Sequence, residues 1–90
     1  MTKEGYVYIL KSSKSDSYYI GSTESIERRY KEHCDGLVKA TKFLLPLKIT
    51  FYKKYATIKE ARQIEYKLKK FKSRKIVEMI IEDGNIKTGS

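Results

Sequence analysis

The sequence predicts a small α+β domain in which one three-stranded antiparallel sheet is flanked by helices. Two tyrosine-rich apolar segments, 5–12 and 17–23, have the period and residue types of strands. Later segments carry apolar residues at three- and four-residue spacing, which is typical of amphipathic helices. A chain of 90 residues is enough for a single domain. We expect residues 1–90 to form that domain, with a core at about 5–83 and a tail at 85–90.

The first predicted strand has apolar side chains on both faces. Tyr6, Tyr8 and Leu10 fall on one face, and Val7 and Ile9 fall on the other. A strand that is apolar on both faces is expected at the centre of its sheet. The polar loop 12–17 then leads to the second strand, on which Tyr19 and Gly21 share a face, and the pair forms an antiparallel hairpin.

The first predicted helix begins at a Ser or Thr N-cap in 22–25 and ends at Asp35-Gly36. Its inner face is expected to contain Ile26, Tyr30, His33 and Leu37, with Arg28, Lys31, Glu32 and Asp35 opposite. The next segment, 37–45, is ambiguous between a loop and a short helical turn.

A third strand follows Pro46, and two more helices follow that strand. In the strand, Leu47, Ile49 and Phe51 are predicted on one face and Lys48, Thr50 and Tyr52 on the other. The second helix, 57–71, has an apolar stripe of Ile58, Ala61, Ile64, Leu68 and Phe71. The third, capped by Ser73 and ended by Gly84, turns Ile76, Val77, Ile80 and Ile81 inward. The predicted order is therefore β-β-α-β-α-α.

The charge of the chain points to a polyanionic partner. Twenty Lys and Arg against eleven Asp and Glu leave a net charge of +9, which favours nucleic acid, although a merely solvated basic surface is the alternative. No apolar run approaches the roughly 20 residues that span a bilayer, and the N-terminus lacks the pattern of a signal peptide. A single cysteine, Cys34, has no intramolecular disulfide partner. We expect a cytoplasmic protein without a membrane partner, and the oligomeric state is left open.

Glu65 is the acidic residue closest to the apolar stripe of the second helix. On a helical wheel it lies roughly 60° from the centre of that stripe. Burial of an unpaired carboxylate costs several kcal/mol, so a cation, a hydrogen-bond donor or a metal ion should lie beside it. A salt bridge to an arginine is the simpler of these explanations.

Two further polar groups share one face of the first helix. Arg29 and His33 are four residues apart and therefore neighbours, beside Ile26 and Tyr30. Taken singly, a histidine at such a position is usually a packed or surface residue, and tyrosines in strands usually belong to the core.

Taken together, these residues resemble the GIY-YIG nuclease superfamily. The two half-motifs correspond to Tyr6-Val7-Tyr8 and Tyr19-Ile20-Gly21, with a loop of the family's length between them. Arg29 matches the family's helix arginine, His33 matches the histidine that many members carry one turn later, and Glu65 matches the single metal-binding glutamate.

The resemblance covers Gly5 to about Ile81 and is closest to small stand-alone bacterial proteins related to the N-terminal domain of the nucleotide-excision-repair excinuclease. There are departures from the pattern. Tyr6 replaces a glycine, and Ser22 stands where the excinuclease branch has a lysine. The asparagine that some members carry late in the chain has no counterpart, because Asn85 lies too far along.

The resemblance implies a divalent-metal-dependent endonuclease that hydrolyses phosphodiester bonds in nucleic acid, with one Mg²⁺ or Mn²⁺ held by Glu65. It implies that Arg29 stabilises charge on the phosphate and that Tyr8 is the general base. Tyr19 and His33 would orient water and phosphate. DNA repair or processing is the expected setting, although residues alone do not separate DNA from RNA.

A basic segment, 62–75, is predicted to contact phosphates in a salt-sensitive manner. The candidate nucleic-acid-binding residues are Lys67, Lys69, Lys70, Lys72, Arg74 and Lys75. Two alternatives to a nuclease are left open: a non-catalytic nucleic-acid-binding module that retains the fold, and a protein-interaction domain.

Overall fold

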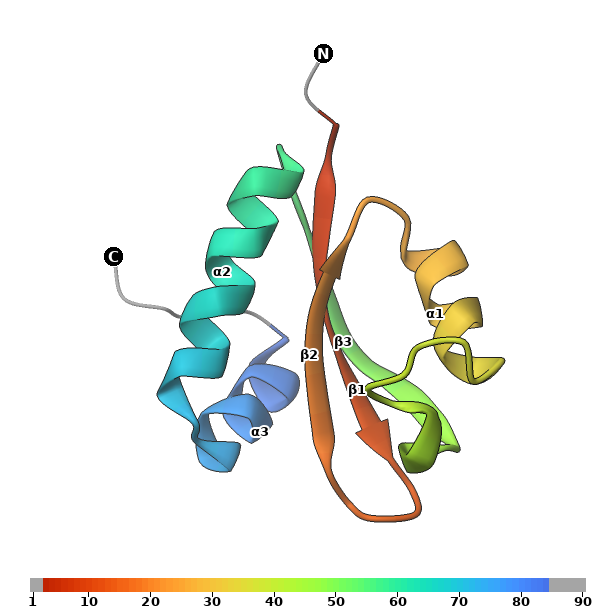
Figure 1. The fold of residues 1–90 in the computed structure, drawn as a ribbon. Helices are drawn as coiled ribbons and strands as arrows, with labels where there is room; N and C mark the ends of the chain where they lie inside the picture. The colour runs from red at the N-terminus through yellow and green to blue at the C-terminus, as the bar shows by residue number, and fades with distance from the viewer. Residues whose placement is uncertain (1–2, 85–90) are drawn as a thin grey trace.

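The computed structural model describes residues 3–84 and has the predicted order of elements (Figure 1). The strands are β1 (Gly5–Ser12), β2 (Tyr18–Thr23) and β3 (Leu47–Tyr55), and the helices are α1 (Ile26–Cys34), α2 (Ile58–Phe71) and α3 (Arg74–Asp83). A 3₁₀ turn at Lys42–Leu44 precedes β3. The predicted α+β class is confirmed, and the predicted tail at 85–90 lies outside the described residues.

The three strands form one antiparallel sheet in the order β2-β1-β3. β1 is therefore central, as its two apolar faces predicted. Figure 1 shows α2 and α3 on one side of the sheet and α1 on the other. The sheet divides the core into two clusters. Under α2 and α3 lie Val7, Ile9, Ile20, Phe51, Ala61, Leu68, Val77 and Ile80, and under α1 lie Tyr8, Leu10 and Leu47.

A β-bulge in β3 changes which face Phe51 occupies. Ile9 pairs with Phe51, whereas the next residue, Leu10, pairs with Ile49, so Thr50 is an extra residue in β3. The Thr50 hydroxyl donates to the carbonyl of Ile9 at 3.0 Å. The prediction that Phe51 and Ile49 share a face is therefore wrong: Phe51 packs under α2 and α3, and Ile49 packs toward α1.

The helix caps are those that the sequence predicted. The side chains of Ser25, Thr57 and Ser73 each accept a hydrogen bond from a backbone N–H three residues later. Capping of this kind satisfies one of the orphan donors at a helix start and contributes about 1 kcal/mol. Within residues 3–84, no helix has the length and apolar character needed to cross a membrane.

Two residues assigned to apolar stripes are exposed instead. Leu37 is 72% exposed because α1 ends at Cys34 and the chain turns at Gly36, whose φ is 76°. The helical period therefore stops before it reaches Leu37. Phe71 is 45% exposed because it is the last residue of α2, where the chain turns toward α3.

The first glycine of the chain sets the position of α2. A Cβ on Gly5 would lie 2.5 Å from the Cα of Ile58, so only glycine allows the start of α2 to approach β1 this closely. The N–H of Ile58 also donates to the carbonyl of Lys3 at 2.9 Å. These contacts fix α2 alongside the sheet, where Glu65 of α2 reaches Ser22 of β2.

Candidate functional site

The candidate site lies around the free edge of β2, where four elements meet. Tyr8 comes from β1, Tyr19 from β2, Arg29 and His33 from α1, and Glu65 from α2. Side chains on opposite faces of a sheet are normally kept apart by the sheet itself. β2 is an edge strand, so side chains from its two faces can approach each other around its unpaired side. Figure 1 shows this strand between α1 and α2.

Gly21 makes room for the phenol of Tyr8. The two residues face each other directly across β1 and β2. A Cβ on residue 21 would lie 2.5 Å from Cζ of Tyr8 and closer still to its hydroxyl oxygen. The bare backbone at this position therefore lets the Tyr8 ring lie across β2 and direct its hydroxyl toward α1.

Gly21→Ala is expected to lower the free energy of unfolding by about 1–3 kcal/mol, because the added methyl group must displace the Tyr8 ring. Gly84→Ala is the matched control: it is strained by a φ of 67°, yet a Cβ there meets no atom within 4 Å. Urea unfolding measures both costs, and the ring ¹H and ¹⁵N shifts of His33 report the displacement. Unmoved His33 shifts in Gly21→Ala would contradict this account.

His33 is fully buried and has a partner on each ring nitrogen. Nε2 lies 2.9 Å from the hydroxyl of Tyr8, and Nδ1 lies 2.7 Å from Oγ1 of Thr41. The imidazole also makes edge contacts with the rings of Tyr8 and Tyr19, at centroid distances of 5.6 and 5.3 Å. These contacts hold the ring in one orientation.

Burial keeps both hydrogen-bonded groups neutral at pH 7. Burial, together with the nearby positive charge of Arg29, lowers the pKa of His33 to about 4, against a smaller opposing effect of Glu32. Burial likewise raises the pKa of Tyr8 to about 12, against the lowering effect of Arg29. The resting site therefore contains a phenol and a neutral imidazole.

The free energy of unfolding is expected to fall between about pH 6.5 and pH 4, by roughly 3 kcal/mol from His33. The unfolded imidazole binds a proton near pH 6.5, whereas the folded one does so only near pH 4. Protons in this range therefore favour the unfolded state. Urea titrations of the wild type and His33→Gln at several pH values test this. Equal pH slopes for the two proteins would contradict it.

Arg29 lies beside Tyr8 at the open side of the site. Its guanidinium acts on the phenol as a hydrogen-bond donor and as a positive charge, and both effects lower the pKa of Tyr8. Nη1 also donates to the carboxylate of Glu32 at 3.2 Å. The Arg29 side chain is 36% exposed, so part of its fork faces solvent and can reach an incoming anion.

Glu65 faces β2 from α2, and its side chain is 20% exposed. One carboxylate oxygen accepts a hydrogen bond from the hydroxyl of Ser22. The other lies 2.6 Å from the ammonium of Lys69, one turn along the helix. The expectation of a cation or a donor beside this carboxylate is met, but by a lysine and a serine and not by an arginine.

Lys69 joins the two sides of the site around the edge of β2. Its ammonium lies 5.5 Å from the centroid of the Tyr19 ring while it pairs with Glu65. Tyr19 in turn packs against Tyr8, with ring centroids 6.4 Å apart, and the negative charge of Glu65 contributes to the raised pKa of Tyr8. All five predicted site residues are therefore connected through one continuous set of contacts.

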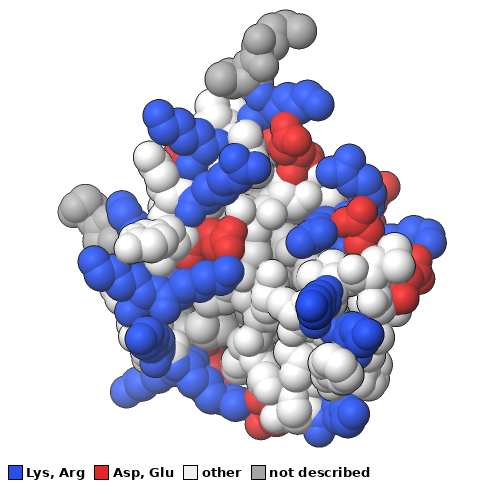
Figure 2. All heavy atoms as spheres, viewed as in Figure 1, with Lys and Arg blue, Asp and Glu red and all other residues white. Residues whose placement is uncertain are grey.

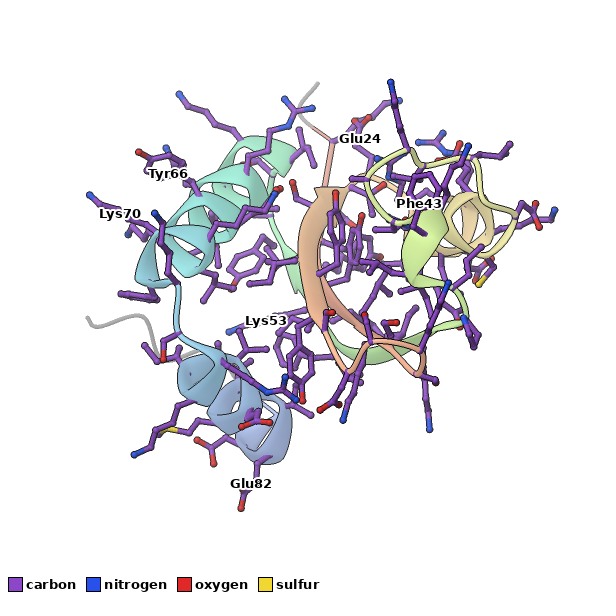
Figure 3. The ribbon with its side chains drawn as sticks, turned by 60° about the horizontal axis from the view of Figure 1, so that its bottom comes forward. Glu24, Phe43, Lys53, Tyr66, Lys70 and Glu82 are labelled. Atoms are coloured by element: carbon purple, nitrogen blue, oxygen red, sulfur yellow. The ribbon has the colours of Figure 1, made fainter. Side chains whose placement is uncertain are left out.

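The predicted phosphate-contacting residues surround the end of α2 and the start of α3. Lys69, Lys72 and Arg74 line a depression of about 280 Å³ beside β2. Lys67, Lys70 and Lys75 are exposed, and Figure 3 shows Lys70 pointing away from the sheet. Figure 2 shows Lys and Arg side chains gathered over the α2 side of this face, with an uncharged band beside them.

Arg74 differs from the other basic residues because its guanidinium already has acidic partners. It donates to the carboxylate of Asp16 at 2.8 Å and to that of Glu78 at 3.3 Å, and it lies over the ring of Tyr18. These contacts connect the β1–β2 loop to α3. Arg74 therefore contributes to the arrangement of the elements as well as to the basic surface.

Thr41 and Ser22 contact the site but were not proposed as site residues from the sequence. Thr41 lies in the segment that the sequence left ambiguous, where no periodicity marks an inward position. Ser22 was noticed only as a departure from the resemblance. Its place next to Gly21 and on the other face of β2 was the available signal that it turns toward α2.

The residues around Glu65 fit a single hydrated hard cation. Mg²⁺ usually takes one or two carboxylates and retains several waters. The Glu65 carboxylate and the Ser22 hydroxyl supply oxygen atoms, which Mg²⁺ and Mn²⁺ prefer. In the part of the chain that the structure describes, no three His, Cys, Asp or Glu residues gather to hold a metal. An ion here would therefore depend on Glu65, water and substrate oxygens, with Lys69 moved aside.

Comparison with known proteins gives matches over most of the chain. The chain is 42% identical over 83 residues to a UPF0213 protein of Bacillus licheniformis. The aligned region covers 91% of this chain and 84% of that protein. The chain is 37% identical over 83 residues to the UPF0213 protein YazA of Bacillus subtilis, covering 91% and 82%. A UPF0213 protein of Clostridium perfringens is 36% identical over 76 residues, covering 83% and 81%. No solved structure gives a significant match.

The family match includes every residue of the candidate site. Residues 4–77 match the family described as the GIY-YIG catalytic domain. That span runs from before β1 into α3 and so contains both tyrosine-rich strands, α1 and Glu65 on α2. The chain belongs to the GIY-YIG nuclease superfamily.

Proposed function

We propose that this protein is a divalent-metal-dependent endonuclease that hydrolyses phosphodiester bonds in nucleic acid, with DNA as the expected substrate. The observation that carries the proposal is the convergence of a phenol, a guanidinium and a carboxylate around the edge of β2. Phosphodiester hydrolysis needs a positioned water, neutralisation of charge on the phosphate and stabilisation of the leaving oxygen.

Arg29 is proposed to bind the phosphate. Its planar fork suits two phosphate oxygens, and it keeps its charge throughout the pH range of the reaction. Arg29 also lies beside the Tyr8 hydroxyl. A phosphate bound to Arg29 would therefore lie next to the phenol oxygen that binds the attacking water. Charge that develops on the phosphoryl oxygens would then meet a fixed positive group.

Tyr8 is proposed to hold and activate the attacking water. With a pKa near 12 it is protonated before reaction, so its oxygen first acts as a hydrogen-bond acceptor for water. As the water loses a proton to this oxygen, the phenol can release its own proton toward Nε2 of His33, 2.9 Å away. The Tyr19 ring packs against the rings of Tyr8 and His33 and restricts their orientation.

Glu65 is proposed to hold the divalent ion, with Ser22 beside it. A bound Mg²⁺ or Mn²⁺ would supply Lewis-acid stabilisation of the leaving oxygen. The Ser22 hydroxyl orients the carboxylate of Glu65. The ammonium of Lys69 can leave Glu65 and pair with a substrate phosphate instead. Lys72, in the adjoining depression, would contact a neighbouring phosphate of the bound nucleic acid.

A role in DNA repair or processing and a place in the cytoplasm complete the proposal. The resemblance to the excinuclease domain and the basic surface beside the site support the role in DNA repair or processing, and the cytoplasmic location is proposed as the place of that role. The names of the relatives state no activity, so the substrate has to be found by experiment.

One observation favours a second candidate function, a non-catalytic nucleic-acid-binding module. The ammonium of Lys69 already compensates the charge of Glu65 in the resting site. A site that kept this ion pair would bind phosphates through its basic residues and exclude a metal ion. Such a module would bind tightly at low salt and would not cut.

A panel of labelled substrates separates the two functions. Duplex, flapped and single-stranded DNA and single-stranded RNA are incubated with Mg²⁺, Mn²⁺ or a chelator, and a Glu65→Ala preparation purified in parallel is the blank. The nuclease predicts metal-dependent products from the wild type only. Salt-sensitive binding without products on every substrate would instead support the binding module, and neither binding nor products would support a protein-interaction domain.

A further inference from the structure

Thr41 is buried next to the site, yet it has no part in the roles assigned so far. It lies between α1 and β3 and is fully inaccessible to solvent, as is His33. Its hydroxyl contacts Nδ1 of His33 at 2.7 Å and the carbonyl of Val38 at 3.5 Å. A carbonyl oxygen can only accept a hydrogen bond. Between a carbonyl and a ring nitrogen, the Thr41 hydroxyl can therefore donate to the carbonyl and accept from the nitrogen.

The direction of the hydrogen bonds can be followed from Val38 to the site. The Val38 carbonyl, 3.5 Å away, offers an acceptor for the Thr41 proton, and this arrangement leaves the hydroxyl oxygen to accept from Nδ1–H of His33. A neutral imidazole has only one N–H, so Nε2 then carries a lone pair. Nε2 is therefore an acceptor for the proton of Tyr8.

The surroundings of Tyr8 lead independently to the same direction. The residue is only 3% exposed, and the polar neighbours of its hydroxyl among the described residues are His33 and Arg29. Arg29 can only donate, so Nε2 of His33 is the available acceptor for the phenol proton. If Nε2 carried the proton instead, the Tyr8 hydroxyl would face two donors, and its own proton would have no protein acceptor among the described residues.

We propose that Thr41 is a positioning residue that holds His33 as its Nδ1–H tautomer, so that Nε2 accepts the proton of Tyr8 and the Tyr8 oxygen, which also accepts from Arg29, keeps one lone pair for the attacking water. The catalytic consequence rests on the function proposed above, whereas the tautomer does not. Thr41 acts through His33 and touches no reacting atom.

The tautomer can be measured directly because His33 is the only histidine in the chain. In ¹⁵N-labelled wild type at pH 7, long-range ¹H–¹⁵N spectra are expected to give a protonated Nδ1 and an unprotonated Nε2. The reverse pattern in the wild type would overturn the proposal without any variant.

Thr41→Val and Thr41→Ser test the cause. Valine keeps the size of the side chain but removes the acceptor for Nδ1–H, so a population of the Nε2–H tautomer is expected to appear. Serine keeps the hydroxyl and should retain the wild-type pattern. Wild-type ¹⁵N shifts in a folded Thr41→Val would overturn the proposal, and if valine prevents folding, the wild-type and serine spectra still decide the tautomer.

Cleavage is a separate readout once a substrate is known. Thr41→Val is expected to lower kcat by about tenfold with little change in KM, because His33 loses the orientation that accepts the Tyr8 proton. Thr41→Ser should keep most of the activity. If no substrate is cut by the wild type while the Nδ1–H tautomer is observed, the proposed function fails and the positioning role of Thr41 stands.

Discussion

Glu65→Gln is expected to lower the rate of phosphodiester cleavage by about 10³-fold or more, because the amide loses the charge that would hold the divalent ion. The fold should survive. The amide oxygen of the variant can still accept from Ser22, and Lys69, which is about half exposed, can be solvated when its partner is neutral. Single-turnover cleavage in Mn²⁺ measures the rate, and thermal unfolding measures the stability.

Glu60→Gln is the matched control for this prediction. Glu60 is an exposed carboxylate in the first turn of the same helix, so its neutralisation changes the net charge equally without touching the site. Mn²⁺ binding followed by electron paramagnetic resonance should weaken in the Glu65 variant and not in the Glu60 variant. Full cleavage by Glu65→Gln would refute the assigned site.

Arg29→Ala is expected to lower the cleavage rate by about 10²- to 10³-fold, the usual cost of removing one group that stabilises developing charge in a transition state. Stability should change little, because the ion pair between Arg29 and Glu32 is partly exposed and such pairs contribute about 1 kcal/mol at most. Arg29→Lys should recover only part of the rate, since an ammonium cannot form the planar two-point contact with a phosphate.

Arg28→Ala separates this effect from the loss of a positive charge on α1. Arg28 is exposed and precedes Arg29 on the same helix, so its removal lowers the general attraction for nucleic acid by the same amount. Filter binding at several salt concentrations should show similar, modest losses for both variants. Cleavage should collapse only for Arg29→Ala, and equal cleavage by the two variants would contradict the role of Arg29.

The elements of the fold could be predicted because their signals are local. The caps at Ser25, Thr57 and Ser73 need only a side chain and a backbone N–H three residues away. The central place of β1 followed from apolar residues on both of its faces. The family residues could be named because the two half-motifs, the arginine and the glutamate occur in the expected order.

The errors arose where a local pattern met a tertiary constraint. The alternation in β3 fails at Thr50, because the bulge adds a residue opposite β1 and returns Phe51 to the other face. The helical period assigned Leu37 to the core, yet the helix has already ended. Neither the bulge in β3 nor the early end of α1 changes the residue composition or the spacing of apolar residues, which are the signals available in the sequence.

The sequence by itself determined the order of the elements, the family and the identity of the five candidate site residues, because each depends on residue types at short spacings. The tertiary structure alone decided that Ser22 is a partner of Glu65 and that Thr41 contacts His33. The reason is geometric. These contacts join different segments of the chain, and they form because α2 packs beside β2 and because the loop after α1 folds back onto His33.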